Sequence, residues 1–126
     1  MSSPSQQRGY RVETAALDYL RHQGLRLLAR NYSCRHGEID LVMRHRSSIN
    51  RNILVFVEVR YRRSNQYGSA AASVGTTKQR RLQKTAEHYC QRHPLQKIWP
   101  ARFDIVAVSG SLDNPCFSWL AGAFEC

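Results

Sequence analysis

The chain has 126 residues, a length that suits one domain with a single hydrophobic core. Its 42% content of hydrophobic residues, with only 7 glycines and 4 prolines, excludes a low-complexity or disordered chain. Nineteen Lys and Arg against nine Asp and Glu give a formal net charge of +10, which favours polyanionic partners. No apolar signal-peptide run opens the chain, and the longest strongly apolar run, Ile53 to Val57, is too short to span a bilayer, so we expect a cytoplasmic protein with no membrane partner.

The N-terminal third predicts one helix and one strand. Residues 1–7 are expected to be a flexible tail, and residues 8–126 a single domain. Helical periodicity predicts a helix from Arg8 to Gln23, and Gly24 is a natural stop. Loose alternation then predicts a strand from Leu25 to Tyr32. The apolar side of the helix carries Val12, Ala16, Leu17, Tyr19 and Leu20.

Two further strands are predicted before the second helix, from Glu38 to Met43 and from Ile53 to Tyr61. The last of these is apolar on both faces, which is typical of a central strand covered on both sides. Consecutive strands joined by short connections can form an antiparallel meander. The segment from Ser64 to Gly75 is expected to be a polar loop.

The second helix is predicted to begin at Thr76, which with Gln79 fits a capping box. Its apolar stripe ends before Pro94, and Phe103 to Val108 reads as a fourth strand. A helix between two strands suits a parallel crossover. The apolar segment 117–124 fits either type of element. The predicted class is α/β (α+β), ordered α-β-β-β-α-β, with a mixed central sheet flanked by helices.

Two carboxylates stand in patterns that otherwise predict burial. Glu58 lies at the end of the central strand, and Asp40 lies between two apolar residues of the strand before it. If these strands are neighbours, both side chains can point to one face, where they would repel each other unless a cation is shared. Hard oxygen ligands of this kind suit Mg²⁺, or Mn²⁺ in its place.

Two other residues extend this group. Glu13 falls inside the apolar arc of the first helix, where an acid is out of place, and it is a third candidate metal ligand. Arg60 follows Glu58 by two positions and therefore lies on the same face of the strand. It is within reach of a phosphate that a metal ion at these acids would bind. The alternative for the acids is a structural role: Asp40, Glu58 and Glu13 would then pair with nearby arginines.

These residues carry a resemblance to a known family. The segments 37–41 (GEIDL) and 56–60 (FVEVR) resemble the GEIDL and FVEVK motifs of the YraN-type family of small bacterial proteins. That family belongs to the restriction-endonuclease-like PD-(D/E)xK superfamily and is similar to archaeal Holliday junction resolvases. The likeness runs from about Arg8 to Phe124 and includes Glu13, Arg30, Asn31, the segment 78–82 and the segment 102–106.

The resemblance implies a restriction-endonuclease-like core in which Asp40 and Glu58 are metal ligands and Glu13 is an additional acid. Resolvases act as dimers, so a homodimer is an arrangement that the sequence leaves open. Arg60 departs from the superfamily motif, which has lysine at this position. Arginine can supply charge and hydrogen bonds but cannot become a neutral base. Lys78 is a hypothetical substitute, provided that the fold brings it close.

The second helix also presents a basic face away from its apolar stripe. We interpret this face as a surface for nucleic-acid phosphates, with DNA favoured over RNA; a merely solvated basic face is the alternative. The candidate nucleic-acid-binding residues are Arg62, Arg63, Lys78, Arg80, Arg81 and Lys84.

Together these features predict a cytoplasmic, Mg²⁺- or Mn²⁺-dependent nuclease that cleaves phosphodiester bonds of DNA, with branched or damaged DNA as candidate substrates. Its catalytic residues would be Glu13, Asp40, Glu58 and Arg60. The alternative is a nucleic-acid-binding protein of the same fold that has lost cleavage. A protein–protein adaptor is a third class, and it would neither bind DNA in a salt-sensitive way nor cut it.

Overall fold

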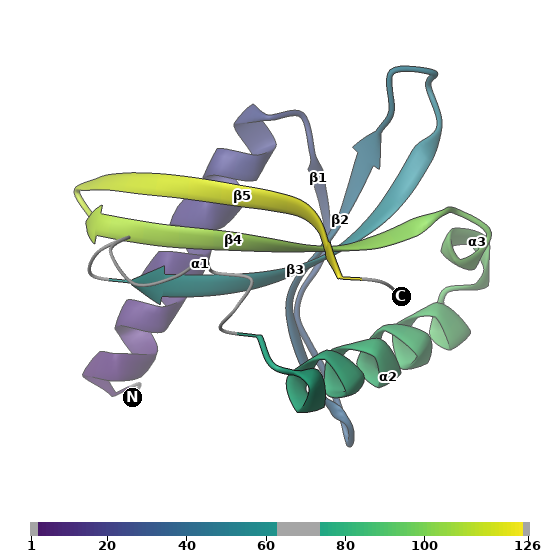
Figure 1. Ribbon diagram of the computed structural model, residues 1–126, viewed down its shortest axis with the longest axis horizontal. Helices are drawn as coiled ribbons and strands as arrows, with labels where there is room; N and C mark the ends of the chain where they lie inside the picture. The colour runs from purple at the N-terminus through teal and green to yellow at the C-terminus, as the bar shows by residue number, and fades with distance from the viewer. Residues whose placement is uncertain (1–2, 63–73, 125–126) are drawn as a thin grey trace.

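The computed structural model describes residues 3–62 and 74–124, which form an α+β fold around one five-stranded sheet with the strand order β1-β2-β3-β4-β5. Helices flank this sheet, as predicted (Figure 1). The elements are α1 (Pro4–His22), β1 (Arg26–Cys34), β2 (Gly37–Arg46), β3 (Asn52–Arg62), α2 (Thr76–Arg92), α3 (Pro94–Lys97), β4 (Ala101–Ser111) and β5 (Asn114–Phe124).

The sheet is mixed, and its connections follow the predicted pattern. Strands β1, β2 and β3 form an antiparallel meander, and α2 lies on the crossover that makes β4 parallel to β3. Two elements differ from the prediction. The apolar segment of undecided type is β5, antiparallel to β4, and a short helix, α3, follows α2.

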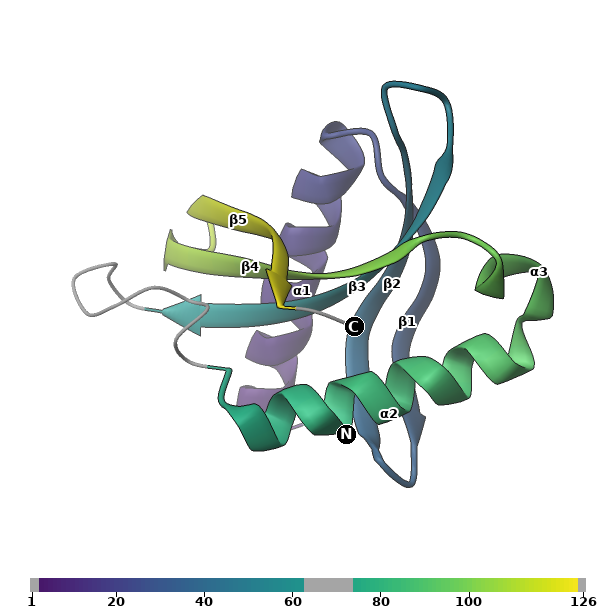
Figure 2. The same cartoon turned by 45° about the vertical axis from the view of Figure 1, so that its right-hand side comes forward.

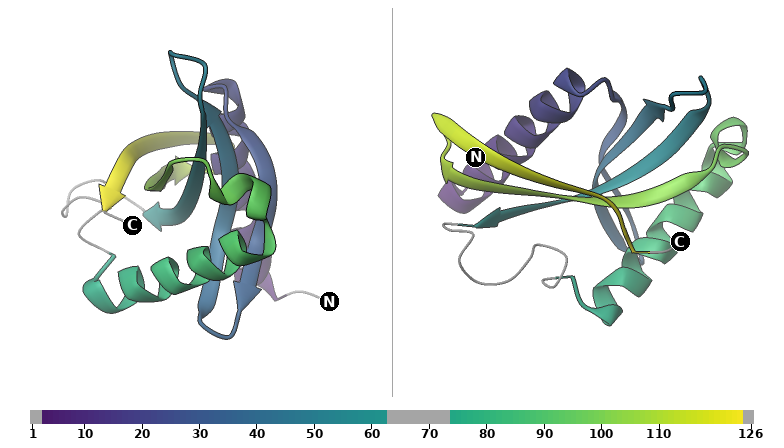
Figure 3. Two further views of the ribbon diagram at one scale, coloured as in Figure 1. Left: turned by 90° about the vertical axis from the view of Figure 1, so that its right-hand side faces the viewer. Right: turned by 45° about the horizontal axis from the view of Figure 1, so that its top comes forward.

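The two long helices cover opposite faces of the sheet, with α1 behind it and α2 in front of it in Figures 1 and 2; Figure 3 shows the same separation from two further sides. The alternating side chains of β3 supply both cores, Val55 and Val57 toward α1, and Leu54 and Phe56 toward α2. This explains why β3 is apolar on both faces. Within residues 3–62 and 74–124, no helix has the length and apolarity that crossing a membrane requires.

The start of α1 and the cap of α2 differ from the prediction, while α2 begins at Thr76 as predicted. Helix α1 begins at Pro4, so residues 4–7 belong to it rather than to a tail; Ser3 and Gln6 form a capping box, and proline fits the first turn. Helix α2 has Gly75 as its N-cap without a side-chain hydrogen bond, so the capping box predicted at Thr76 is wrong. Gln79 instead donates to the carbonyl of Val74.

The sheet divides into two parts at one point. The β2–β3 ladder runs from Arg46↔Asn52 to Leu41↔Val57 and ends there. Beyond it, β2 remains paired with β1 as far as Gly37, and β3 remains paired with β4 as far as Arg62. The β1–β2 hairpin and the β3–β4–β5 ribbon therefore diverge, downward and to the left in Figures 1 and 2.

Asp104 anchors the outer strands. It is fully buried in β4, where the β4–β5 register shifts between Phe103 and Ile105. Its carboxylate accepts hydrogen bonds from Arg102 Nε at 2.9 Å, Trp119 Nε1 at 2.9 Å and the Gly122 amide at 3.0 Å. These bonds compensate the buried charge, so Asp104 ties β5 to β4 and pairs with Arg102.

We expect Asp104→Ala to lower the free energy of unfolding by about 3 kcal/mol, because it leaves buried donors without their acceptor. Urea denaturation measures this loss. Asp113→Ala is the matched control: its carboxylate is 96% exposed, so its effect should stay under about 0.5 kcal/mol. Equal effects of the two substitutions would contradict the anchoring role of Asp104.

Candidate active site

Asp40 lies directly beyond the last pair of the β2–β3 ladder. If the ladder continued in the same register, Val59 would pair with Ile39. Its amide instead donates to Asp40 Oδ2 at 2.8 Å. The side chain thus replaces a missing main-chain partner, and this fixes the carboxylate in the fork between the two halves of the sheet.

The carboxyl groups of Asp40 and Glu58 meet in this fork within hydrogen-bonding reach. Burial, followed by repulsion from the Glu58 carboxylate, raises the pKa of Asp40 to about 7, although the Val59 amide acts against both. Only 8% of the Glu58 side chain is exposed. Both sequence-predicted acids therefore share one poorly hydrated position, where a second negative charge is costly.

Lys78 brings a cation to this pair. It lies in the first turn of α2, and its Nζ is 3.3 Å from Glu58 Oε2. Its side chain is 43% exposed, so the ammonium group bridges the buried acids and the solvent. The fold therefore brings Lys78 to the position that the sequence hypothesis required.

Glu13 lies near the same acids but has its own partner. Arg30 Nε donates to Glu13 Oε1 at 3.1 Å, and Arg30 Nη2 donates to Thr14 Oγ1 and to the carbonyl of Tyr10. Burial raises the pKa of Glu13, and the Arg30 hydrogen bond opposes that shift. The structural alternative considered for Glu13, pairing with an arginine, is therefore present in the structure.

Two residues near the acids were not predicted as site residues. Asn31 has a positive φ of 54°, and the β1–β2 register places it opposite Asp40; its side chain hydrogen-bonds to Glu13. Burial, then the negative charges of Asp40 and Glu13, raise the pKa of Glu38. Both residues belong to the part of the sequence that resembles the family motifs, and this resemblance was the only feature of the sequence that pointed to them.

Arg60 follows Glu58 on the same face of β3, as predicted. Its Nε is buried, with no hydrogen-bond partner among the residues the structure describes. Within the same residues it forms no ion pair with a carboxylate. Arg60 therefore does not neutralise the acid pair, and Lys78 is the cation that contacts it.

The acids border two hollows that both include Asp40. One, of about 300 Å³, lies on the α1 side and is lined by Glu13, Val59 and Arg8 among others. The other, of about 340 Å³, lies on the α2 side, where Lys78 and Arg81 line it. Asp40 is thus accessible to a ligand from either face of the fork.

No group of three or more His, Cys, Asp or Glu side chains in the described parts of the chain is arranged to hold a metal ion. Of the three predicted ligands, Asp40 and Glu58 come together, while Glu13 contacts Arg30. A two-carboxylate site is the arrangement that remains.

The candidate nucleic-acid-binding residues separate into several places. Lys78 and Arg81 line the hollow next to Asp40, and Lys84 lines a different hollow farther along α2. Arg80 is exposed on α2, and Arg62 ends β3. Arg63 and most of the predicted polar loop lie outside the described residues.

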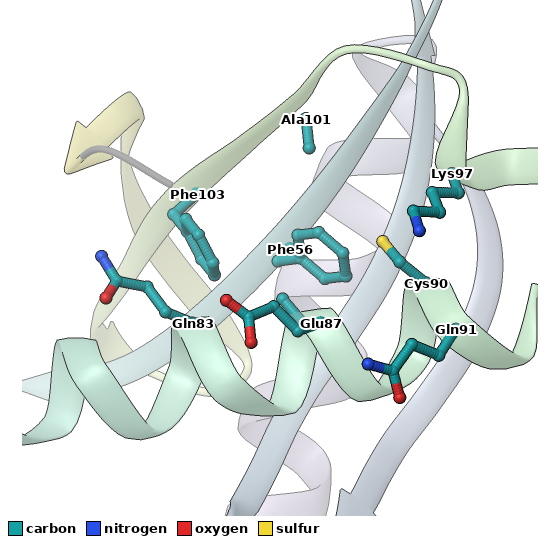
Figure 4. A pocket seen from close by; sticks show the side chains of 9 residues that line it. Phe56, Gln83, Glu87, Cys90, Gln91, Lys97, Ala101 and Phe103 are labelled. Carbon is teal, nitrogen blue, oxygen red and sulfur yellow. The ribbon is translucent and has the colours of Figure 1, made fainter.

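A further cavity, of about 420 Å³, lies between α2 and the sheet, and Figure 4 shows its lining. The Phe56 and Phe103 rings form its floor, with Gln83, Gln91 and Lys97 around it. Glu87 is the single carboxylate at its edge. Without an acid pair, this cavity lacks the chemistry of the fork.

Taken together, the described residues form an α+β core consistent with that of nuclease-like α/β proteins, with an acid pair and a lysine where its sheet divides. The chain belongs to the uncharacterised protein family UPF0102, whose model matches residues 12–108. It is 44% identical to a UPF0102 protein of Stutzerimonas stutzeri (strain A1501) over 98% of both chains. It is 45% identical to one of Xanthomonas campestris pv. campestris (strain B100) over 99% of this chain and 97% of the relative. The family expected from the motifs is confirmed.

The raised pKa of Asp40 predicts how stability changes with pH. The folded state holds the Asp40 proton more tightly than the unfolded state, whose pKa is near 3.8. The protonated Asp40 therefore adds its whole contribution to the free energy of unfolding below about pH 4. This contribution is lost as pH rises through about 7.

We therefore expect Asp40→Asn, which removes the titration, to gain stability over the wild type as pH rises from about 5 to about 8, by up to a few kcal/mol. Thermal melts in EDTA at both pH values measure the difference. If the stability difference between Asp40→Asn and the wild type does not change with pH, Asp40 does not titrate in this range.

Proposed function

We propose that this protein is a metal-dependent nuclease that hydrolyses phosphodiester bonds of DNA. The observation that carries the proposal is the meeting of Asp40 and Glu58 in the fork, with Lys78 Nζ 3.3 Å from Glu58. Two acids and a lysine are the components of the PD-(D/E)xK site that the motifs resemble. Here α2 supplies the lysine, whereas the superfamily motif has it on the strand of the glutamate.

The acid pair suits a divalent cation. Two partly desolvated carboxylates within hydrogen-bonding reach repel each other when both are ionised, and a shared cation relieves that repulsion. Their hard oxygen atoms suit Mg²⁺ or Mn²⁺. Asp40 and Glu58 would hold the ion, and Glu13, paired with Arg30, would add negative charge from nearby. When bound, such an ion activates water and neutralises charge on a phosphodiester.

The two cations next to the acids have different capacities. Lys78 can donate hydrogen bonds to a phosphate oxygen or to the attacking water, and a lysine can also give up its proton. Arg60 keeps its charge at any relevant pH, so it can only stabilise negative charge. The Nε of Arg60 is buried, so only the rest of its guanidinium group can approach a phosphate oxygen.

Loss of cleavage with retention of DNA binding is the second candidate function. It is favoured by the two ion pairs, Lys78–Glu58 and Arg30–Glu13, which already neutralise two of the acids. Both candidates require DNA binding that weakens with salt, because phosphate contacts release counterions. Only the nuclease candidate also requires that cleaved DNA is formed.

We expect Asp40→Asn and Glu58→Gln each to reduce Mg²⁺-dependent cleavage of DNA at least about a hundredfold while DNA binding is retained. Gel analysis of linear, nicked and branched DNA measures cleavage, and fluorescence anisotropy measures binding. Binding by the wild type without product on any of these substrates would support the second candidate.

We expect Lys78→Ala to reduce cleavage about a hundredfold, because it removes the cation beside Glu58. Lys78→Arg distinguishes charge from proton transfer, since arginine supplies only the charge. Lys97→Ala is the control: it removes a lysine from the cavity of Figure 4 and should leave the rate unchanged. Full activity of Lys78→Ala would remove Lys78 from the site.

Metal binding can be measured without activity. We expect Mg²⁺ or Mn²⁺ to raise the melting temperature, equivalent to about 2.7 kcal/mol when the ion is at a hundredfold its dissociation constant. Asp40→Asn or Glu58→Gln should abolish the shift, and the exposed Asp113→Asn should retain it. A shift that survives both site substitutions would place the metal elsewhere.

A further inference from the structure

The hollow that Lys84 lines lies farther along the face of α2 that carries Lys78. Its volume is about 470 Å³, and its lining comes from the β1–β2 turn and from α2. The lining residues are Arg35, His36, Lys84, Glu87, His88 and Gln91. Arg35 and Lys84 place two cations here against the single negative charge of Glu87.

The hollow is built from segments that pack closely. Gly37, which ends the β1–β2 turn, has a φ of +149°, and a Cβ added there would lie 3.4 Å from Thr85 Oγ1. The turn therefore lies directly against α2. Arg35 Nε also donates to His36 Nε2 at 3.4 Å, so the two turn side chains lie together.

His88 is held by a neighbour outside the hollow. The Tyr32 hydroxyl lies 2.5 Å from His88 Nδ1. Burial raises the pKa of Tyr32, so the phenol keeps its proton, and the Tyr32 hydroxyl and His88 Nδ1 share one hydrogen bond. This contact leaves Nε2 as the ring nitrogen of His88 that can meet a ligand. With Arg35 and Lys84, His88 makes the hollow rich in hydrogen-bond donors.

The hollow continues the basic face that begins at the acid pair. Lys78, Arg81 and Lys84 follow one another at spacings of three residues, and His88 follows at four, so they lie along one side of α2. Lys84 lies six positions after Lys78, which is about 9 Å along the helix.

We propose that this hollow is a phosphate subsite, which binds the DNA backbone farther along α2 than the acid pair of Asp40 and Glu58. It rests on the proposed function for its ligand, DNA, and extends it by defining the path of the strand along α2. Arg35, Lys84 and His88 are the donors to the phosphate, and Glu87 weakens binding by repulsion.

The test is binding of a labelled DNA duplex in EDTA, measured by anisotropy over a series of NaCl concentrations. The double variant Arg35→Ala/Lys84→Ala should bind DNA at least about tenfold more weakly. The slope of the logarithm of its binding constant against the logarithm of the NaCl concentration should be less steep by about two. Arg46→Ala/Arg51→Ala is the matched control, because it removes the same charge at the opposite end of β2 and should change affinity less than about twofold. Glu87→Gln should bind more tightly than the wild type.

Failure of the subsite can be distinguished from failure of the proposed function. Equal weakening by the two double variants would overturn the subsite and leave the proposed function intact, because net charge alone would then explain the loss. Wild-type protein that does not bind DNA would overturn both.

Discussion

The hydrogen bond from the Val59 amide to Asp40 Oδ2 lies where the main-chain pairing of β2 and β3 ends, and the rest of the site depends on it. At this point the sheet must leave backbone groups without strand partners, which is costly away from water. A side-chain carboxylate accepts one of them. The fork is thereby stable while open, and its open side receives the Glu58 carboxyl group and the Lys78 ammonium group.

The same division of the sheet arranges the charges around it. Helix α1 brings Glu13 from one face, and α2 brings Lys78 from the other, so positive and negative groups reach Asp40 from opposite sides. Arg30 neutralises Glu13 and also binds the Tyr10 carbonyl and Thr14, which ties α1 to β1. The ion pairs thus hold the helices in position and limit the net negative charge of the acid cluster.

Local patterns were sufficient to predict the centre of the fold. Because β3 is apolar on both faces and its neighbours follow by short connections, the meander and the proximity of Asp40 to Glu58 could be expected. The pairing of Arg30 with Glu13 could not, since it depends on the angle at which α1 crosses β1. Nor could β5, whose sequence is apolar without strict alternation and whose pairing includes a bulge. The cap of α2 was mistaken because Thr76 occupies the first helical turn and the extended residue before it is Gly75.

The placement of Lys78 on α2 has a consequence for how such proteins are recognised. When an acid and a lysine lie two positions apart on one strand, the strand itself fixes their separation. Here nineteen residues lie between Glu58 and Lys78, and their approach is set by the packing of Leu82, Ala86 and Tyr89 on the sheet. The approach of Lys78 to the acid pair is thus a property of the folded chain and not of one short segment of sequence. Relatives with a lysine placed in this way are better found by comparing the positions of charged atoms than by searching for a linear motif.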